Sequence, residues 1–217
     1  MKFTIQQGCD CGATLTHETY GSSDWPLIIC SDCKDARVLI DPLSVSFIAE
    51  RVLYRAKHEL ENGDYTLTVL LGAIAVESFI TKLFLKLKRM DSLSSSPYWP
   101  TMADEEQWEK QFKRIRGFEN IANSISEQMT DKLFDEFACT NSVACKALAS
   151  FSEISGTVPS VLIQTELFDR RNRIAHWGFV DSTVEEANIC MRLAAATVRV
   201  FGEMDRIKFR PNDPPIL

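Results

Sequence analysis

Apolar residues recur at helical spacing along most of the chain after residue 42. In residues 43–60 they stand mostly three or four positions apart, and the turn "NGD" ends this run. Asp64 is placed to cap a second helix that runs to about Arg89. The polar stretch "DSLSSSPYWP" contains two prolines, which cannot continue a helix, so residues 91–100 are predicted to form a loop.

The remaining pattern is also helical. Residues 105–137 carry helical periodicity, whereas residues 139–160 are ambiguous. Pro159 suits the first turn of a further helix. A closing helix is expected after Ser182 or Thr183, either of which can cap it, with two glutamates in its first turn. The chain from residue 43 onward is therefore predicted to be an all-α bundle.

Residues 1–42 have a different pattern. Short stretches such as "KFTIQ" and "ARVLI" alternate in polarity, as β-strands do, and turn residues separate them. Four cysteines form two close pairs, C-x-C and C-x-x-C, on either side of an eighteen-residue loop: Cys9, Cys11, Cys30 and Cys33. Because each tight turn aims two sulfur atoms at one point, two such pairs suit a tetrahedral metal ion.

This cysteine pattern resembles a zinc ribbon, although the usual first pair in that family is C-x-x-C and here it is C-x-C. The resemblance implies a small β module over residues 1–42. Its Zn²⁺ would be structural, since four thiolates leave no open position for water. His17 is an alternative ligand. The other interpretation is that the four cysteines are unrelated buried thiols.

The composition is typical of a soluble protein. The chain has 217 residues, 45% hydrophobic and 25% charged, enough for one ordinary domain and a small module. No secretory pattern opens it, and its most apolar region, residues 67–87, is interrupted by Glu77, Lys82 and Lys86. We therefore expect a cytoplasmic protein with reduced cysteines and no membrane segment. The net charge of −6 argues against broad nucleic-acid binding but leaves room for a local basic site.

One basic cluster, "FDRRNRIAHWG", occupies residues 168–178. On a helical wheel Arg171 falls within an apolar face, and so does Glu77 on the second helix. The apolar residues around Arg171 are Ile163, Leu167, Phe168, Ile174 and Ala175, and those around Glu77 are Leu70, Ala73, Ile74 and Phe84. Since a buried charge needs a partner, we expect Glu77 to meet Arg171 between two packed helices, as a structural bridge or in a polar cleft.

His176 and Asn172 lie four positions apart and share a neighbouring helix face. A histidine at a helix end often serves only the helix dipole. Beside three arginines, however, its imidazole can exchange protons near neutral pH while a guanidinium stabilises charge on a phosphate. The cluster therefore suits phosphodiester cleavage by general acid–base catalysis.

The hexapeptide "RNRIAH", residues 171–176, resembles the R-x4-H signature of the HEPN family, in which a polar residue such as Asn often follows the Arg. A preceding long helix with "AVESF", a glycine soon after the motif and an acidic-capped closing helix also match, so the resemblance covers residues 43–208. It implies an antiparallel HEPN-like helical bundle over residues 43–217. Such bundles usually form homodimers, and many cleave RNA at one composite site without a catalytic cofactor.

By this resemblance, the ribose 2′-hydroxyl attacks the adjacent phosphate and leaves a cyclic phosphate and a free 5′-hydroxyl. His176 would act as general base or acid, and Arg171 would stabilise charge on the phosphate. Asn172 would orient one of them or bind phosphate, and Glu77 would position Arg171.

The resemblance also implies RNA contacts and a form of control. Arg170 and Arg173 are expected to contact flanking phosphates. In the branch of the family that adenylylation silences, a tyrosine stands two residues after the motif histidine, and here Gly178 occupies that position. The expected role is a bacterial toxin or antiphage defence effector. Its control is then expected from an antitoxin or other regulatory protein, from an assembly, or from a cue sensed elsewhere.

Two other interpretations compete with a nuclease. HEPN domains also serve as non-catalytic scaffolds or binding modules, in which case the zinc ribbon would contact RNA or a protein partner. Replacing His176 by alanine separates these alternatives, because a scaffold would tolerate the change. A cysteine hydrolase is disfavoured because no glycine-rich nucleophile turn surrounds Cys139, Cys145 or Cys190.

Overall fold

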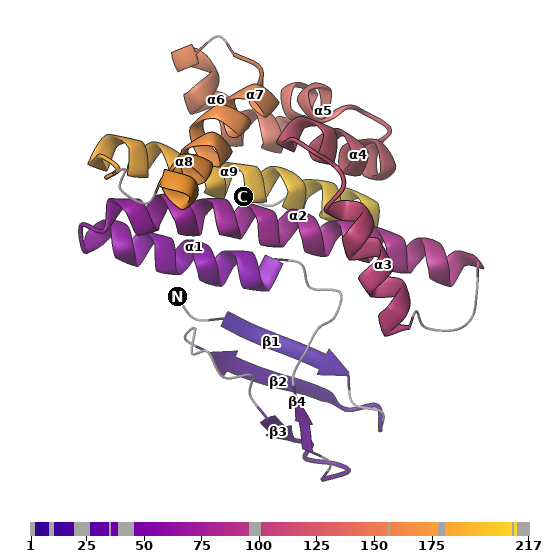
Figure 1. Cartoon of the computed structure of the whole chain (residues 1–217). Helices are drawn as coiled ribbons and strands as arrows, with labels where there is room; N and C mark the ends of the chain where they lie inside the picture. The colour runs from indigo at the N-terminus through magenta and orange to yellow at the C-terminus, as the bar shows by residue number, and fades with distance from the viewer. Residues whose placement is uncertain are drawn as a thin grey trace. The chain divides into compact units, whose positions relative to one another are not determined.

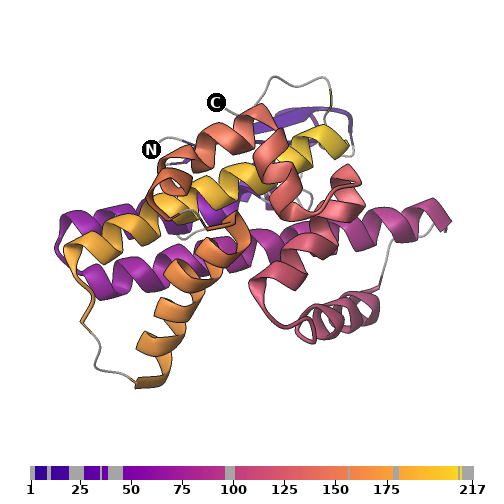
Figure 2. The same ribbon diagram turned by 90° about the horizontal axis from the view of Figure 1, so that it is seen from above.

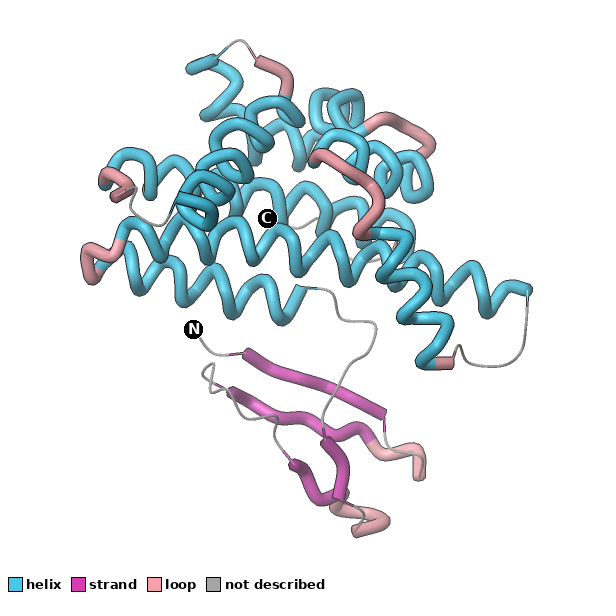
Figure 3. The backbone as a smooth tube through the Cα atoms, in the orientation of Figure 1, coloured by secondary structure: helices cyan, strands magenta, loops and turns pink. Residues whose placement is uncertain are grey.

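The structure of the chain, a computed structural model, divides into two compact units, Met1–Ser44 and Val45–Leu217 (Figures 1 and 3). Cys9 and Gly178, which the sequence singled out, lie outside the described residues. The structure describes residues 3–8, 11–19, 27–34, 36–38, 46–95, 101–155, 157–177, 181–209 and 211.

The first unit contains two antiparallel hairpins. Strand β1 (Phe3–Gly8) pairs with β2 (Thr14–Thr19), and β3 (Leu27–Ile29) pairs with β4 (Ala36–Val38). Gly12, between β1 and β2, has a φ of 90°, which glycine adopts without strain. The strands follow the alternating stretches in the sequence, while the assignment of a zinc ribbon stays a prediction.

The second unit is helical, which confirms the all-α prediction for the body of the chain. A π-helical segment, η1, interrupts one of its helices. The elements are α1 (Ser46–Glu61), α2 (Tyr65–Ser95), α3 (Met102–Phe112), α4 (Phe118–Thr130), α5 (Phe134–Thr140), α6 (Ser142–Ser155), α7 (Pro159–Ile163), η1 (Gln164–Asp169), α8 (Arg170–Trp177) and α9 (Val184–Phe209).

The helix ends show which local signals were informative. The Asp64 carboxylate accepts a hydrogen bond from the Leu67 amide at 2.9 Å, so the predicted cap of α2 is confirmed. The predicted loop over residues 91–100 is wrong for its first half, because α2 continues to Ser95. No proline occurs there, and the Ser94 hydroxyl donates back to the Met90 carbonyl at 2.8 Å. The ambiguous stretch from residue 139 onward contains α6.

Helices α1, α2 and α9 form the centre of the bundle. Helices α1 and α2 are joined by a short turn and run antiparallel, and the Thr68 hydroxyl of α2 lies 3.3 Å from the Ala56 carbonyl of α1. Helices α2 and α9 lie side by side in both views (Figures 1 and 2) and run parallel, because Gly72 lies near Ala194 and Lys86 bonds Asp205. The predicted antiparallel arrangement therefore describes α1 and α2 but not α2 and α9.

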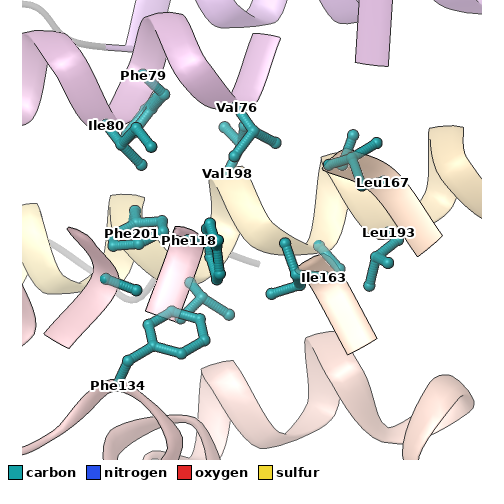
Figure 4. Packing of buried hydrophobic residues seen from close by; sticks show 14 of the residues in the cluster. Val76, Phe79, Ile80, Phe118, Phe134, Ile163, Leu167, Leu193, Val198 and Phe201 are labelled. Atoms are coloured by element: carbon teal, nitrogen blue, oxygen red, sulfur yellow. The ribbon is translucent and has the colours of Figure 1, made fainter. Parts of the chain in front are cut away.

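The hydrophobic core lies between α2, α9 and the shorter helices (Figure 4). Phe134 is completely buried, and its ring stacks on Phe201 at 5.2 Å and meets the edge of Phe118 at 5.5 Å. Aromatic side chains bury a large apolar area each, so this cluster is a main source of stability. It joins α4, α5 and α9, which are far apart in sequence.

Helix α2 is, among the described residues, the one helix long and apolar enough to cross a bilayer, with a mean hydropathy of 1.8 over its best window. This hydropathy is higher than the sequence analysis expected, because Glu77, Lys82 and Lys86 were expected to interrupt the apolar run. More than half of the window is buried inside the bundle. Its Lys86 ammonium is also buried there and pairs with the Asp205 carboxylate at 2.7 Å. Packing within the protein therefore explains the apolar character of α2.

Candidate functional site

The motif residues lie on a helix that changes its winding just before them. Pro159 occupies the first turn of α7, as predicted, and α7 continues through the π-helical segment η1 into α8. A π-turn is wider than an α-turn, so it shifts the faces of the residues that follow. Ala175, which a regular wheel places on the buried face, is exposed, whereas Ile174 is buried.

Arg171 and Glu77 meet as the sequence predicts. The Arg171 Nη2 atom lies 2.6 Å from both carboxylate oxygens of Glu77, and its Nη1 atom donates to Asn172 Oδ1 at 2.8 Å. Their side chains are 30% and 38% exposed, so the pair is half-buried rather than buried. Ile74, expected on the buried stripe beside Glu77, is 40% exposed. The guanidinium is therefore held in one orientation while part of it faces solvent.

Arg170 has different partners from Arg171 and is held by two carboxylates. Its Nε atom donates to Glu166 at 3.0 Å, and its Nη1 atom bonds Glu186 on α9. Burial acts to lower the pKa of Arg170, but the hydrogen bond and charge of Glu166 and the charge of Glu186 outweigh burial and raise it. These contacts tie the motif helix to its neighbours.

Glu186 also belongs to the cap of α9. The Thr183 hydroxyl accepts from the Glu186 amide at 3.2 Å, and the Glu186 carboxylate accepts from the Thr183 amide at 3.0 Å. This reciprocal capping box selects Thr183 over Ser182 as the cap. The hydrogen bond from the Thr183 amide, together with the charge of Arg170, lowers the pKa of Glu186. One carboxylate thus joins the start of α9 to α8.

Arg173 and His176 are exposed on α8. His176 lies one turn beyond Asn172 and in the last turn of the helix. Figure 2 shows that α8, in orange, runs away from α2 toward its C-terminal end. The motif therefore presents an anchored arginine at the helix side and an accessible histidine at the helix end.

A pocket of about 510 Å³ opens beside the anchored arginine. Its floor and walls are mostly apolar, and charged and amide side chains stand among them. It is lined by Glu77, Ile80 and Thr81 from α2, Glu109, Phe112 and Lys113 at α3, Gly117, Phe118 and Ile121 at α4, and Gln164, Phe168, Arg171 and Asn172 from η1 and α8. His176 is not among these residues. The pocket therefore borders one part of the motif.

The sequence did not single out four polar side chains of this pocket, Thr81, Glu109, Lys113 and Gln164. Glu109 and Lys113 belong to a helix with ordinary exposed charged positions, so no local signal marks them. Gln164 accepts a hydrogen bond from the Phe118 amide at 2.9 Å and donates to Asp169 at 2.6 Å. The first contact holds the start of α4 against η1, and the second, within η1, orients the Gln164 side chain. Only the tertiary fold brings these residues to the motif.

In the first unit, Cys11, Cys30 and Cys33 come together, with their sulfur atoms all within 4.8 Å of one another. The Sγ atoms of Cys11 and Cys30 are 3.6 Å apart, close to the spacing of about 3.8 Å that tetrahedral Zn–S bonds produce. Backbone hydrogen bonds from Cys33 and Asp32 lower the pKa of Cys30 to about 7, which favours the thiolate that a metal binds. These three residues fit a zinc site, and Cys9 lies outside the described residues.

The other three cysteines have no such arrangement within the described residues. Cys190 is buried in α9, and burial raises its pKa to about 12. Its thiol donates to the Glu166 carbonyl at 2.9 Å. Cys139 and Cys145 are exposed on α5 and α6. The neutral, enclosed Cys190 is the opposite of an activated nucleophile.

Comparisons of the chain with protein-family models, with curated proteins and with solved structures find no match. The HEPN resemblance therefore rests on the sequence motif and its helical context.

Proposed function

We propose that this protein is a metal-independent RNA endonuclease of HEPN type that acts as a homodimer. The observation that carries the proposal is that Glu77 of α2 and Asn172 of α8 hold the Arg171 guanidinium, while His176 on the same helix α8 stays accessible. A fixed guanidinium and an accessible imidazole on one helix are suited to phosphodiester cleavage, because one stabilises charge and the other moves protons.

The reaction is internal transesterification. The ribose 2′-oxygen forms a bond to the adjacent phosphorus while the bond from phosphorus to the 5′-oxygen breaks. His176 takes the proton of the 2′-hydroxyl or gives one to the leaving 5′-oxygen, and His176 of a second copy does the other. The products are a 2′,3′-cyclic phosphate and a 5′-hydroxyl. Arg171 stabilises the charge that develops on the non-bridging oxygens.

The two arginines next to Arg171 and Asn172 have different proposed roles. Arg173 is exposed and suits a contact with a flanking phosphate. Arg170, also expected to bind RNA, is engaged by Glu166 and Glu186, so in this proposal it orients α8. Glu77 offsets part of the charge of Arg171 and is therefore a positioning residue.

The first unit is proposed to hold a structural Zn²⁺ through Cys9, Cys11, Cys30 and Cys33, and no step of the cleavage uses it. The dimer is proposed to bring two copies of α8 together. The cellular role is proposed to be a cytoplasmic toxin or antiphage effector restrained by a partner protein.

The test is cleavage of a mixed RNA pool by the purified protein in excess EDTA, with the ends of the products analysed. His176→Ala should reduce the rate by about 10²–10⁴-fold without changing the melting temperature. His58→Ala is the matched control, because His58 is also an exposed histidine in the last turn of a helix, α1. Cyclic-phosphate ends made by the wild type and His58→Ala alone would support the proposal.

A non-catalytic binding module is the second candidate. Three carboxylates, Glu77, Glu166 and Glu186, pair with Arg170 and Arg171, and such pairing is also what a purely structural helix junction needs. In that case wild type and His176→Ala would both leave RNA intact as folded dimers. The first unit would then be tested for binding RNA or protein.

A further inference from the structure

We propose that the pocket between α2, α3, α4 and the η1–α8 helix receives one unpaired nucleobase of the RNA and sets the base preference of cleavage. This inference rests on the proposed function, since it places a base beside the phosphate that Arg171 contacts. It adds a specificity site to the motif.

The lining of the pocket suits a planar ring. Phe118 and Phe168 stack on each other at 5.4 Å and form an apolar floor. Phe112 and Ile121, both partly buried, supply side walls. A volume of about 510 Å³ accommodates a base with part of its ribose. Apolar and aromatic surfaces of this kind gain free energy from stacking any base.

The charge of the pocket favours a neutral group over a phosphate. Its four charged side chains are Glu77, Glu109, Lys113 and Arg171, two acidic and two basic, so their formal charges cancel. Glu77 moreover pairs directly with Arg171 and offsets part of its charge on the pocket side. An anion would gain little inside such a pocket, whereas a base with a polar edge would keep its hydrogen bonds.

Asn172 supplies a polar edge to the lining of the pocket. Its Oδ1 atom accepts from Arg171 at 2.8 Å, which leaves its amide N–H groups as donors. An amide side chain is a common partner for base edges. The same residue therefore borders both the proposed base and Arg171, the part of the motif that the pocket adjoins.

A pocket-filling variant tests the inference. Thr81 lines the pocket, and its hydroxyl donates to the Glu77 carbonyl at 2.7 Å. Thr81→Phe places a ring in the pocket and alters none of the proposed catalytic residues. Thr165→Phe is the matched control, because the Thr165 hydroxyl also donates to the carbonyl four residues earlier, at 3.0 Å, and Thr165 does not line the pocket. Ile121→Trp fills the pocket from α4 and serves as a second variant.

Two measurements are made on the full chain. The first is the cleavage rate of short RNAs that differ in the base on either side of one scissile bond. The second is calorimetric binding of AMP, GMP, CMP, UMP and inorganic phosphate to His176→Ala, alone and combined with each pocket variant. We expect one nucleotide to bind best and Thr81→Phe to weaken it by about tenfold or more, with the base preference lost. Thr165→Phe should retain both properties.

The outcomes separate this inference from the proposed function. Suppose that folded Thr81→Phe and Ile121→Trp keep the base preference of the wild type while His176→Ala is inactive. This result would overturn the proposed base site but support the proposed nuclease function. Equal binding of inorganic phosphate and all four nucleotides would also overturn the base site. Loss of dimerisation in both pocket variants would instead assign the pocket to a protein interface. If the wild type cleaves nothing, selective nucleotide binding that only the pocket variants weaken would still support a base site.

Discussion

The two units of this chain differ in the side chains that they bring together. In the first unit, Cys30 is the one buried side chain among those whose burial the structure describes, and its buried sulfur belongs to a cysteine cluster. In the second unit, a continuous apolar cluster reaches from α1 to α9. Modules of about 40 residues commonly need a bound ligand to fold, whereas a bundle with a continuous apolar core does not. The difference predicts which changes unfold which unit.

Metal removal should have the largest effect, and only on the first unit. Structural zinc contributes on the order of 10 kcal/mol to folding of small modules, so Cys30→Ser or a strong chelator should unfold residues 1–44. Zinc content by mass spectrometry and the amide NMR signals of the strands measure this. Cys145→Ser is the control, since Cys145 is an exposed cysteine on α6. Persistence of the strand signals without metal would contradict the ligand-dependent interpretation.

Truncating a core side chain should destabilise the second unit and leave the first unit unchanged. Phe134→Ala removes a fully buried ring at the junction of α4, α5 and α9 and should lower the free energy of unfolding of the bundle by about 3–5 kcal/mol. Leu133→Ala, one residue earlier, should change it by less than about 0.5 kcal/mol because Leu133 is 47% exposed. Urea unfolding followed by circular dichroism measures both. Zinc content should stay unchanged in the two variants.

The elements and one key contact could be predicted because their causes are local or costly to violate. Asp64 and Thr183 cap helices through neighbouring amides, and short-range patterns reveal such caps. Glu77 and Arg171 could be paired because a charge in an apolar stripe needs a partner.

Other features could not be predicted, since they depend on tertiary packing. The π-segment η1 breaks the constant angle that a helical wheel assumes, and α8 then runs away from α2 (Figure 2), where Ala175 is exposed. The pocket requires α3 and η1 to approach each other, and Glu109 and Gln164 are separated by too many residues for any pattern to link them.

The cap of α9 should give a smaller effect than the core. Thr183→Ala removes the hydroxyl that accepts from the Glu186 amide and should lower the free energy of unfolding by about 1 kcal/mol. Thermal unfolding measures the change. Ser182→Ala is the neighbouring control, because the Ser182 backbone amide donates to the Thr66 hydroxyl and the substitution keeps that amide. Equal losses in the two variants would mean that Thr183 does not act as the cap.

The same cap should be sensitive to acid. The pKa of Glu186 is lower in the folded protein than its ordinary value of 4.5, so its contribution is fully present above that pH. It is lost as the pH falls through the lowered folded pKa. The difference in stability between wild type and Glu186→Gln should therefore be constant near neutral pH and shrink in acid. A difference that stays constant across the acid range would show that the carboxylate charge is not involved.

The smallest effect on folding is expected at Glu77. The Glu77–Arg171 pair is about one-third exposed, and such pairs contribute less than about 1 kcal/mol, so Glu77→Gln should leave the melting temperature nearly unchanged. The glutamine keeps a hydrogen bond to Arg171 but loses the charge that fixes it. Under the proposed function, kcat for RNA cleavage should fall by about tenfold or more with little change in KM, because misplacing a catalytic group mainly affects the transition state.

Glu109→Gln is the matched control for Glu77→Gln. Glu109, on α3, lines the same pocket, but it is Glu77 that bonds Arg171. A similar loss in both variants would indicate a general change in pocket charge, whereas a loss confined to Glu77 would assign the effect to the orientation of Arg171. A large loss of stability in Glu77→Gln would instead favour the scaffold interpretation. The Glu77–Arg171 pair would then contribute to stability as the core residues do. A loss of activity in this variant would in that case follow from a loss of folding.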